Sequence, residues 1–210
     1  MSVIQRSGNK GVYYGSLLDS SGVPTEDQQK ANMTYIYRFL TAEGWSVNAI
    51  AAMIGNMIAE SALNPGRWQS DNVGNTSSGY GLVQWTPASN YINWVYSEGY
   101  SDPSEMDTAL RRIIYEKQTG AQWIATSEYN FSFSEFAASD SDVGELAAAF
   151  LLNYERPADQ SASVQAYRAA LASIAYTYLT GSGGGSGGGI SSRRRKKKFN
   201  FVLFGKKVRQ

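Results

Sequence analysis

The chain has 210 residues, and 42% of them are hydrophobic, which is enough to fill the core of one compact domain. It contains no cysteine and no histidine. This excludes disulfides, thiolate metal sites, the usual zinc sites and catalysis by Ser-His or Cys-His pairs. Acid–base chemistry must therefore fall to Asp, Glu, Tyr or Lys, and we expect no metal and no cofactor.

The first part of the chain predicts two helices. Thr25 and Gln28 match a capping box, and apolar residues recur at helical spacing over residues 31–40. Ser46 is suited to cap a second helix, from Val47 to about Ser61. Because this second helix is apolar on nearly every side, we expect it to be buried in the core.

The middle of the chain predicts a loop, a short extended segment and further helices. Residues 64–78 are rich in Asn, Gly, Ser and Pro, whereas residues 79–85, GYGLVQW, alternate as a short strand does. Thr86-Pro87 is expected to start a helix with a cap and a proline in the first turn. Later helices are expected near residues 104–125, 142–154 and 160–179. The predicted fold class is mainly α, with one short β segment.

Charge divides the chain unevenly. The first 180 residues carry ten basic and 18 acidic residues, a net charge of −8, whereas the last 30 carry nine basic residues and no acid. The sequence GSGGGSGGG between these parts is typical of a flexible spacer. We therefore predict an N-terminal extension, a globular domain, a Gly/Ser linker and a basic aromatic tail, at residues 1–24, 25–180, 181–190 and 191–210.

Glu60 is the most informative single residue. It lies at the end of the apolar helix, just before an Asn-Pro turn. Partial desolvation raises the pKa of a carboxyl at such a position, and a general acid needs a raised pKa to protonate a glycosidic oxygen near neutral pH. The alternative is that the side chain simply emerges into solvent at the helix end.

Several separate motifs resemble those of one known family. They are ESALNP at residues 60–65, SSGYGLVQ at residues 77–84, and the segments GNMIAES, NPGRWQ and LLNYERP. Together they resemble the phage tail lysozyme domain of tail-tip peptidoglycan hydrolases. This domain is part of the lysozyme-like superfamily, with goose-type lysozymes and lytic transglycosylases. The resemblance spans roughly residues 31–179 and implies a lysozyme-like helical domain whose short β segment lies beside a cleft.

The resemblance implies a set of site residues. Glu60 would be the catalytic acid, Gln84, Tyr80 and Trp85 would line the saccharide cleft, and Tyr154 would lie on its far side. Aromatic rings suit the flat faces of sugars, and an amide suits their N-acetyl groups. For Tyr80 and Trp85, packing in the core is an equally good interpretation of the residues.

The second catalytic group is left open by the sequence. Inverting and retaining glycosidases both need a second carboxylate, at about 6.5–9.5 Å and about 5 Å from the acid respectively. Asp71 and Glu155 are candidates, although Glu155 also suits an ion pair with Arg156 or Arg67. The resemblance also allows a single carboxyl that works with the N-acetyl group of the substrate and leaves a 1,6-anhydro sugar.

Two functions from different classes are compatible with these motifs. The first is a peptidoglycan glycosidase, of the muramidase or lytic transglycosylase type. It would cleave the β-1,4 bond between N-acetylmuramic acid and N-acetylglucosamine, for wall penetration by a phage tail or a mobile element. The second is a non-catalytic peptidoglycan-binding or structural tail module. The intact Glu60 favours the enzyme.

The basic tail and the location complete the expectations. The tail sequence RRRKKKFNFVLFGKKVRQ suits an anionic wall polymer, a membrane surface or another virion protein, and we expect no specific nucleic acid as partner. The start of the chain lacks the basic and apolar run of a secretory signal, and no segment reaches the roughly 20 apolar residues of a membrane span. A virion tail tip, or the outside of the bacterial cell wall, is the expected location.

Overall fold

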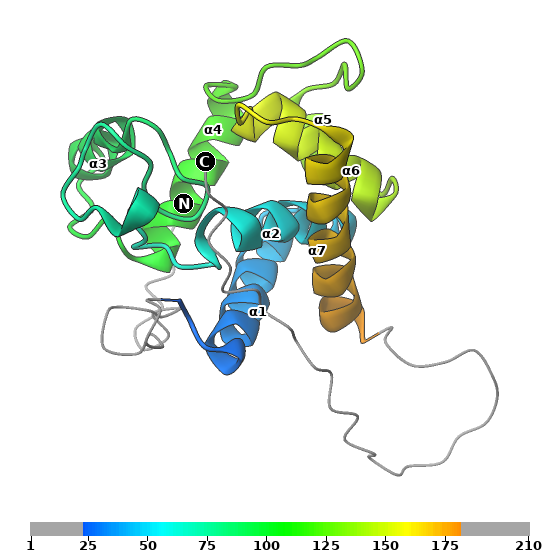
Figure 1. Ribbon diagram of the computed structural model, residues 1–210, viewed down its shortest axis with the longest axis horizontal. Coiled ribbons are helices and arrows are strands. Elements are labelled where there is room, and N and C mark those ends of the chain that lie inside the picture. The colour runs from blue at the N-terminus through cyan, green and yellow to red at the C-terminus, as the bar shows by residue number, and fades with distance from the viewer. Residues whose placement is uncertain (1–22, 182–210) are drawn as a thin grey trace.

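The computed structural model describes residues 23–181, so most of the N-terminal extension, the linker beyond Gly181 and the basic tail lie outside the described residues. Helices dominate the described part (Figure 1). In chain order they are α1 (Glu26–Ala42), α2 (Val47–Ser61), the 3₁₀ turn η2 (Gln69–Asp71), α3 (Ala88–Ser97), α4 (Met106–Thr119), α5 (Phe133–Ala138), α6 (Val143–Phe150), the π-helical turn η3 (Leu151–Glu155) and α7 (Ala162–Thr180).

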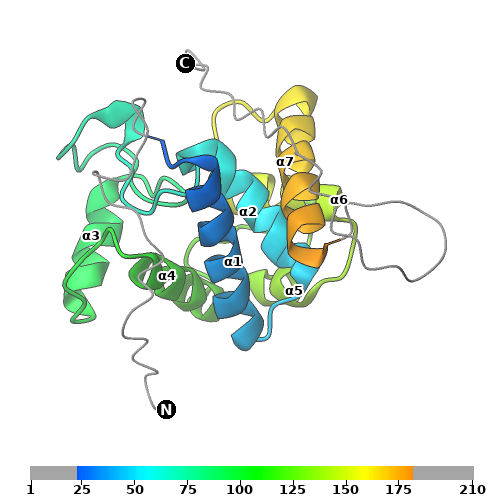
Figure 2. The same ribbon diagram turned by 90° about the horizontal axis from the view of Figure 1, so that it is seen from below.

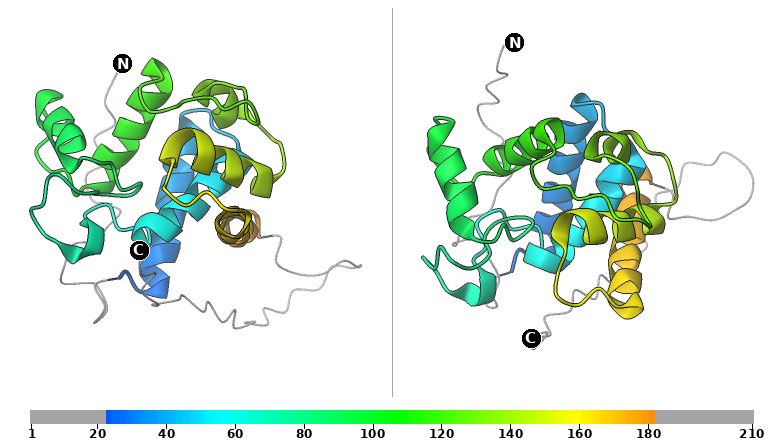
Figure 3. Two further views of the ribbon diagram at one scale, coloured as in Figure 1. Left: turned by 45° about the horizontal axis from the view of Figure 1, so that its top comes forward. Right: turned by 90° about the horizontal axis from the view of Figure 1, so that it is seen from above.

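Helix α2 is the buried centre of the fold. Its residues from Ala49 to Ile58 are all buried, as its apolar sequence predicts. Ser46 caps the helix by accepting a hydrogen bond from the amide of Ala49 at 3.0 Å. Helix α2 packs chiefly against α7 and α6, and Figure 3 shows α7, almost end-on in its left panel, beside α2.

The two central helices approach closely at one glycine. A Cβ atom added to Gly55 of α2 would lie 2.5 Å from the backbone nitrogen of Ala172 in α7. Real Cβ atoms essentially never come this close to other atoms, so only glycine permits this spacing of the two backbones. The contact matters for the site because α7 then passes beside the C-terminal half of α2.

The segments between α2 and α4 form the opposite side of the molecule. Helix α3 and the loops before it lie on one side of α2, and α7 lies on the other (Figures 1 and 2). Stacked aromatic rings fill this side, where Tyr91 of α3 packs against Trp85 at 4.3 Å and against Tyr80 at 6.0 Å between ring centroids.

Most of the predicted helices are confirmed, and the details that differ have local causes. The capping box is present, with the amide of Thr25 donating to Gln28 at 2.7 Å. Residues 79–85 make only two isolated bridges, between Tyr80 and each of Trp68 and Trp85, because positive φ angles at Gly81 and Gln84 turn the chain. Pro87 lies at the N-cap position, one residue before helix α3, and not in its first turn.

Candidate active site

The sequence places Glu60 at the end of α2, and the structure shows how this end is fixed. The helix stops because Ala62 adopts a left-handed conformation, with φ 55°. The hydroxyl of Ser61 donates to the carbonyl of Leu82 at 2.9 Å and so joins the end of α2 to the turn that contains Gln84. The Glu60 side chain is 20% exposed, a sheltered position that is still open to solvent.

The carboxyl of Glu60 is not alone, because Arg168 of α7 forms an ion pair with it. The guanidinium Nη2 contacts Oε1 of Glu60, and Nη1 donates to the carbonyl oxygen of Asn56 at 2.8 Å. The Arg168 side chain is only 9% exposed, so water screens this pair weakly. A neighbouring guanidinium favours the ionised carboxylate, whereas the sequence argument considered only desolvation.

A second carboxyl, that of Glu155, lies close enough for its charge to interact with that of Glu60. Glu155 is the last residue of η3, and its Oε1 atom is buried without a hydrogen-bond partner. Burial raises the pKa of Glu155 well above its usual value of 4.5, and the charge of Glu60 raises it further, while Arg168 opposes this effect. Burial thus favours the protonated form of Glu155, whereas the carboxyl of Glu60 has a charged partner in Arg168.

A third carboxyl, Glu116 of α4, is fully buried and holds several segments together. It accepts hydrogen bonds from Nε of Arg112 at 2.7 Å, from the indole Nε1 of Trp85 at 3.0 Å, and from the hydroxyl of Tyr154. Burial raises the pKa of Glu116, although the Arg112 charge and the three donors act against this. Glu116 thereby connects α4, the turn that carries Trp85, and η3.

The predicted cleft residues differ in how much surface they offer. Trp85 and Tyr154 are 5% and 1% exposed, and their polar atoms bind Glu116. Tyr80 is also buried, in contact with Trp68. Gln84 is half-buried, and its amide nitrogen donates to the carbonyl of Gly81 at 2.9 Å. The structure brings these residues to one region beside the end of α2, and their contact with a saccharide stays a prediction.

The two candidates for a second carboxylate are placed very differently. Asp71 has a side chain that is 69% exposed, 3.9 Å from Arg67. Arg156 donates to the backbone carbonyls of Gln122 and Asn153, both at 2.6 Å. Neither arginine forms the ion pair with Glu155 that the sequence suggested as an alternative. Of the two candidates, Glu155 is the one beside Glu60.

Sequence reasoning missed Arg168 and Glu116. Glu116 carried a signal, because it follows Ala109 and Ile113 at helical spacing and so falls on the apolar face of its helix. Arg168 is the one charged residue of α7, in an otherwise apolar and neutral helix. An isolated charge of this kind indicates a buried partner, but the sequence does not identify Glu60, 108 positions away, as that partner.

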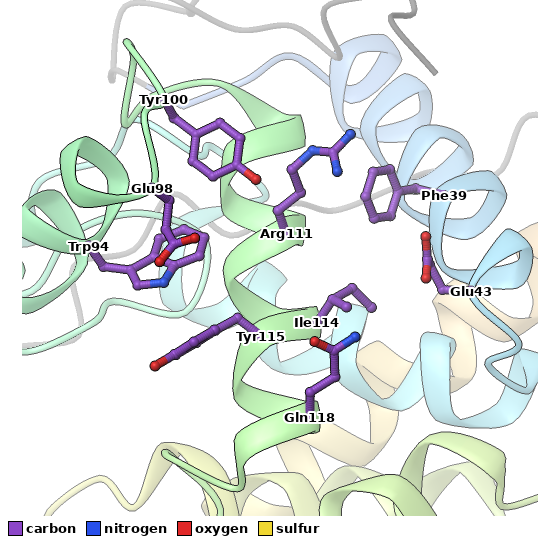
Figure 4. Close-up of a pocket in the computed structure, with 9 residues that line it drawn as sticks. All are labelled: Phe39, Glu43, Trp94, Glu98, Tyr100, Arg111, Ile114, Tyr115 and Gln118. Atoms are coloured by element: carbon purple, nitrogen blue, oxygen red, sulfur yellow. The ribbon is translucent and has the colours of Figure 1, made fainter. Parts of the chain in front are cut away.

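A half-open pocket lies elsewhere, between α1, α3 and α4 (Figure 4). Its volume is about 210 Å³, and none of the predicted site residues lines it. In Figure 4 the aromatic side chains of Trp94, Tyr100 and Tyr115 gather on one side of α4, with Phe39 on the other. We therefore base the site on Glu60 and its neighbours and not on this pocket.

Two further properties concern the described residues alone. Between residues 23 and 181, no group of three or more acidic side chains is placed to hold a metal ion. Within the same residues, every helix is too short or too polar to cross a membrane.

The mainly helical fold, with a carboxyl at the end of a buried central helix, defines a lysozyme-like domain. Residues 31–179 match the family model of the phage tail lysozymes, and the chain belongs to this family. Over 156 residues it is 44% identical to Morphogenesis protein 1 of Bacillus phage B103. The match covers 74% of this chain and 41% of that relative, so the chain spans about two-fifths of the relative's length.

Family membership confirms the resemblance of the sequence motifs and identifies a phage-associated, lysozyme-like protein. The name of this relative refers to morphogenesis and to no activity. The bond that is cleaved and the residues that act are therefore matters for the proposal that follows.

Proposed function

We propose that the protein is a peptidoglycan glycosidase that cleaves the β-1,4 bond between N-acetylmuramic acid and N-acetylglucosamine. Glu60 is its catalytic acid and protonates the leaving glycosidic oxygen. The observation that carries this proposal is the pair of neighbouring carboxyls, Glu60 and Glu155, of which the first is ion-paired and the second has a buried oxygen without a hydrogen-bond partner. A carboxyl whose pKa is raised by burial, beside a second carboxyl with a charged partner, is typical of a site for acid–base chemistry.

The other predicted residues support this function in different ways. Gln84 keeps part of its side chain exposed beside the end of α2, and we assign it the contact with an N-acetyl group. Because Tyr80, Trp85 and Tyr154 are buried, we assign them to the layer beneath the surface that the substrate contacts. The substrate then lies along the turn at residues 79–85, in reach of Glu60.

The proposed setting is a virion. Morphogenesis protein 1, the relative described above, is a phage protein. A wall-cleaving domain at a tail tip would open the cell wall locally during infection. The basic tail at residues 191–210 lies outside the described residues, and we propose that it contacts an anionic wall polymer, a membrane surface or another virion protein.

The test is release of fragments from purified peptidoglycan by the full chain and by Glu60→Gln. Glutamine keeps the shape of the side chain but cannot donate the carboxyl proton, so we expect the rate to fall about 10²–10⁴-fold. Glu98→Gln, a change at an exposed glutamate after α3, is the matched control and should keep the wild-type rate. Equal release by wild type and Glu60→Gln would refute the assignment of the acid.

Mass spectrometry of the released fragments identifies the bond and the mechanism. Reducing N-acetylmuramic acid ends indicate hydrolysis, whereas 1,6-anhydro ends indicate transglycosylation.

One observation favours the non-catalytic alternative, since Arg168 holds Glu60 in an ion pair that must open before the carboxyl can act as an acid. A binding module would sediment with insoluble peptidoglycan and release no fragments from it.

A further inference from the structure

Three charged side chains from three elements form one cluster, and one of the three is the proposed acid. They are Glu60 from α2, Arg168 from α7 and Glu155 from η3. Arg168 uses both terminal nitrogens, on Glu60 and on the carbonyl of Asn56, whereas its Nε is buried without a hydrogen-bond partner. Oε1 of Glu155 is buried and without a partner as well. An unused donor atom and an unused acceptor atom, both buried, thus lie in the same cluster, where each is costly.

The charges of the cluster allow only one ionised carboxyl beside Arg168. One guanidinium neutralises one carboxylate, and a second buried carboxylate would remain uncompensated. The remaining charged groups near Glu155 are Arg156, which binds two backbone carbonyls, and Glu116, which is paired with Arg112. Because the buried Oε1 atom of Glu155 has no hydrogen-bond partner, whereas Oε1 of Glu60 contacts Arg168, Glu155 keeps the proton and Arg168 compensates the charge of Glu60.

We propose that Glu155 stores the proton that Glu60 donates, and that Arg168 determines which of the two carboxyls is ionised. The proposal rests on the function proposed above and explains how an acid that is ion-paired at rest can still protonate a sugar. Glu155 and Arg168 are positioning residues in this scheme, and Glu60 alone contacts the glycosidic oxygen.

The step begins when a glycan strand enters and the leaving oxygen approaches Glu60. The ion pair between Arg168 and Glu60 opens, and Nε of Arg168 turns to Oε1 of Glu155. The O–H bond of Glu155 breaks and an O–H bond forms on Glu60, directly or through one water, so the total charge of the cluster does not change. Glu60 then gives this proton to the leaving oxygen as the glycosidic bond from that oxygen to C1 breaks, and as a carboxylate it binds Arg168 again. The oxygen of a water, or of the sugar's own 6-hydroxyl, forms the new bond to C1 and releases its proton to solvent. Glu155 regains a proton from solvent.

The first test is the pH dependence of cleavage of soluble glycan strands by the full chain. We expect Glu155→Gln to lower kcat ten- to a hundredfold with little change in KM, because binding does not use Glu155. In the pH–rate profile of Glu155→Gln, the fall in rate at alkaline pH should begin at a lower pH than in the wild type. Burial raises the pKa of Glu155, so the wild type keeps the Glu155 proton to higher pH. Glu155→Asp restores an ionisable group and should recover part of the rate and of the alkaline limb.

The matched control is Glu145→Gln. Glu145 is exposed in the first turn of α6, the helix that leads directly into η3, so its replacement should change neither kcat nor the pH profile. A wild-type rate and pH profile in Glu155→Gln, with Glu60→Gln inactive, would refute the proton store and leave the proposed function intact. Failure of the wild type to release any fragment would instead remove the proposed function, and this inference with it.

A second measurement does not depend on activity. In the full chain labelled with ¹³C at glutamate side chains, we expect a carboxyl that stays protonated well above pH 4.5 and whose signal is missing in Glu155→Gln. Saturating chitotetraose should shift this signal towards the ionised carboxylate and the signal of Glu60 towards the protonated carboxyl. The proposal would be overturned if every glutamate ionised near pH 4.5, or if chitotetraose left the carboxyl signals unchanged.

Discussion

Replacing Gly55 with alanine tests whether the close approach of α2 and α7 positions the proposed acid. The new Cβ atom would lie 2.5 Å from the backbone nitrogen of Ala172, and ordinary contact begins at 3.4 Å. The backbone of α7 must therefore move away by about 0.9 Å. Arg168 lies one turn before Ala172, so its hydrogen bond to Asn56, now 2.8 Å, would lengthen to about 3.7 Å, beyond the range of a hydrogen bond.

Three effects set the expected loss of stability. Overpacking costs about 1–3 kcal/mol, and loss of a buried hydrogen bond from a charged donor costs about 1.5–3 kcal/mol. Alanine offsets about 1 kcal/mol of this, because it has a higher helix propensity than glycine. The net loss is about 1.5–5 kcal/mol, and at about 2–4 °C per kcal/mol Tm should fall by at least about 3 °C.

The assay is thermal unfolding of Gly55→Ala, followed by circular dichroism, beside peptidoglycan release at a temperature where the variant is folded. Ser173→Ala, an exposed change on the solvent side of α7, is the control and should keep the wild-type Tm. Adding Ala172→Gly should not restore Gly55→Ala, because the backbone nitrogen and Cα of residue 172 still obstruct the new methyl group. Stabilisation by about 1 kcal/mol, as helix propensity alone predicts, would refute the reasoning.

Two further predictions concern the buried carboxyls. Tyr154→Phe removes only the hydroxyl that binds Glu116, so urea unfolding should show a loss of about 1.5–3 kcal/mol, while the folded variant keeps its rate of wall cleavage. A rate loss without a stability loss would point instead to direct substrate contact. Burial raises the pKa of Glu155 above its unfolded value of about 4.5. The folded state then binds more protons, and this contribution to stability is lost as pH rises through the raised pKa. Urea unfolding across pH should therefore show a flatter decline in Glu155→Gln than in wild type, and parallel curves would contradict the buried, protonated state.

The helices could be predicted from the sequence where their signals are local. Ser46 is an N-cap, as predicted, because capping depends on a side chain and amides two or three residues away. Helix α5 was not predicted, although Ser132 and Glu135 form a capping box at its start, because six residues give too short a period to detect. The turn at residues 79–85 was interpreted as extended because alternation does not reveal a positive φ at a non-glycine residue, and Gln84 has a φ of 51°.

The site was less predictable than the fold, because its electrostatics depend on contacts between distant parts of the chain. Glu60 could be found from its own surroundings, an apolar helix and an Asn-Pro turn. Arg168, which forms an ion pair with Glu60, comes from a helix more than a hundred residues later. The charges that act on Glu155 likewise come from α2, α4 and α7. Local sequence therefore identified the carboxyl at the end of α2 but not the charged groups around it.

The position of Arg168 also resolves a conflict within α2. The C-terminus of a helix carries a partial negative charge, so a carboxylate such as Glu60 in the last turn is disfavoured there. A cation at the same end compensates both charges, and Arg168 does so by donating to Oε1 of Glu60 and to the carbonyl of Asn56, one turn earlier. The guanidinium of arginine presents two donors in a rigid fork, which matches these two acceptors. A lysine would interact with them only as a point charge. The same arginine that stabilises the helix end must leave Glu60 when the acid acts, and the orphaned oxygen of Glu155 gives its guanidinium a second acceptor at that moment.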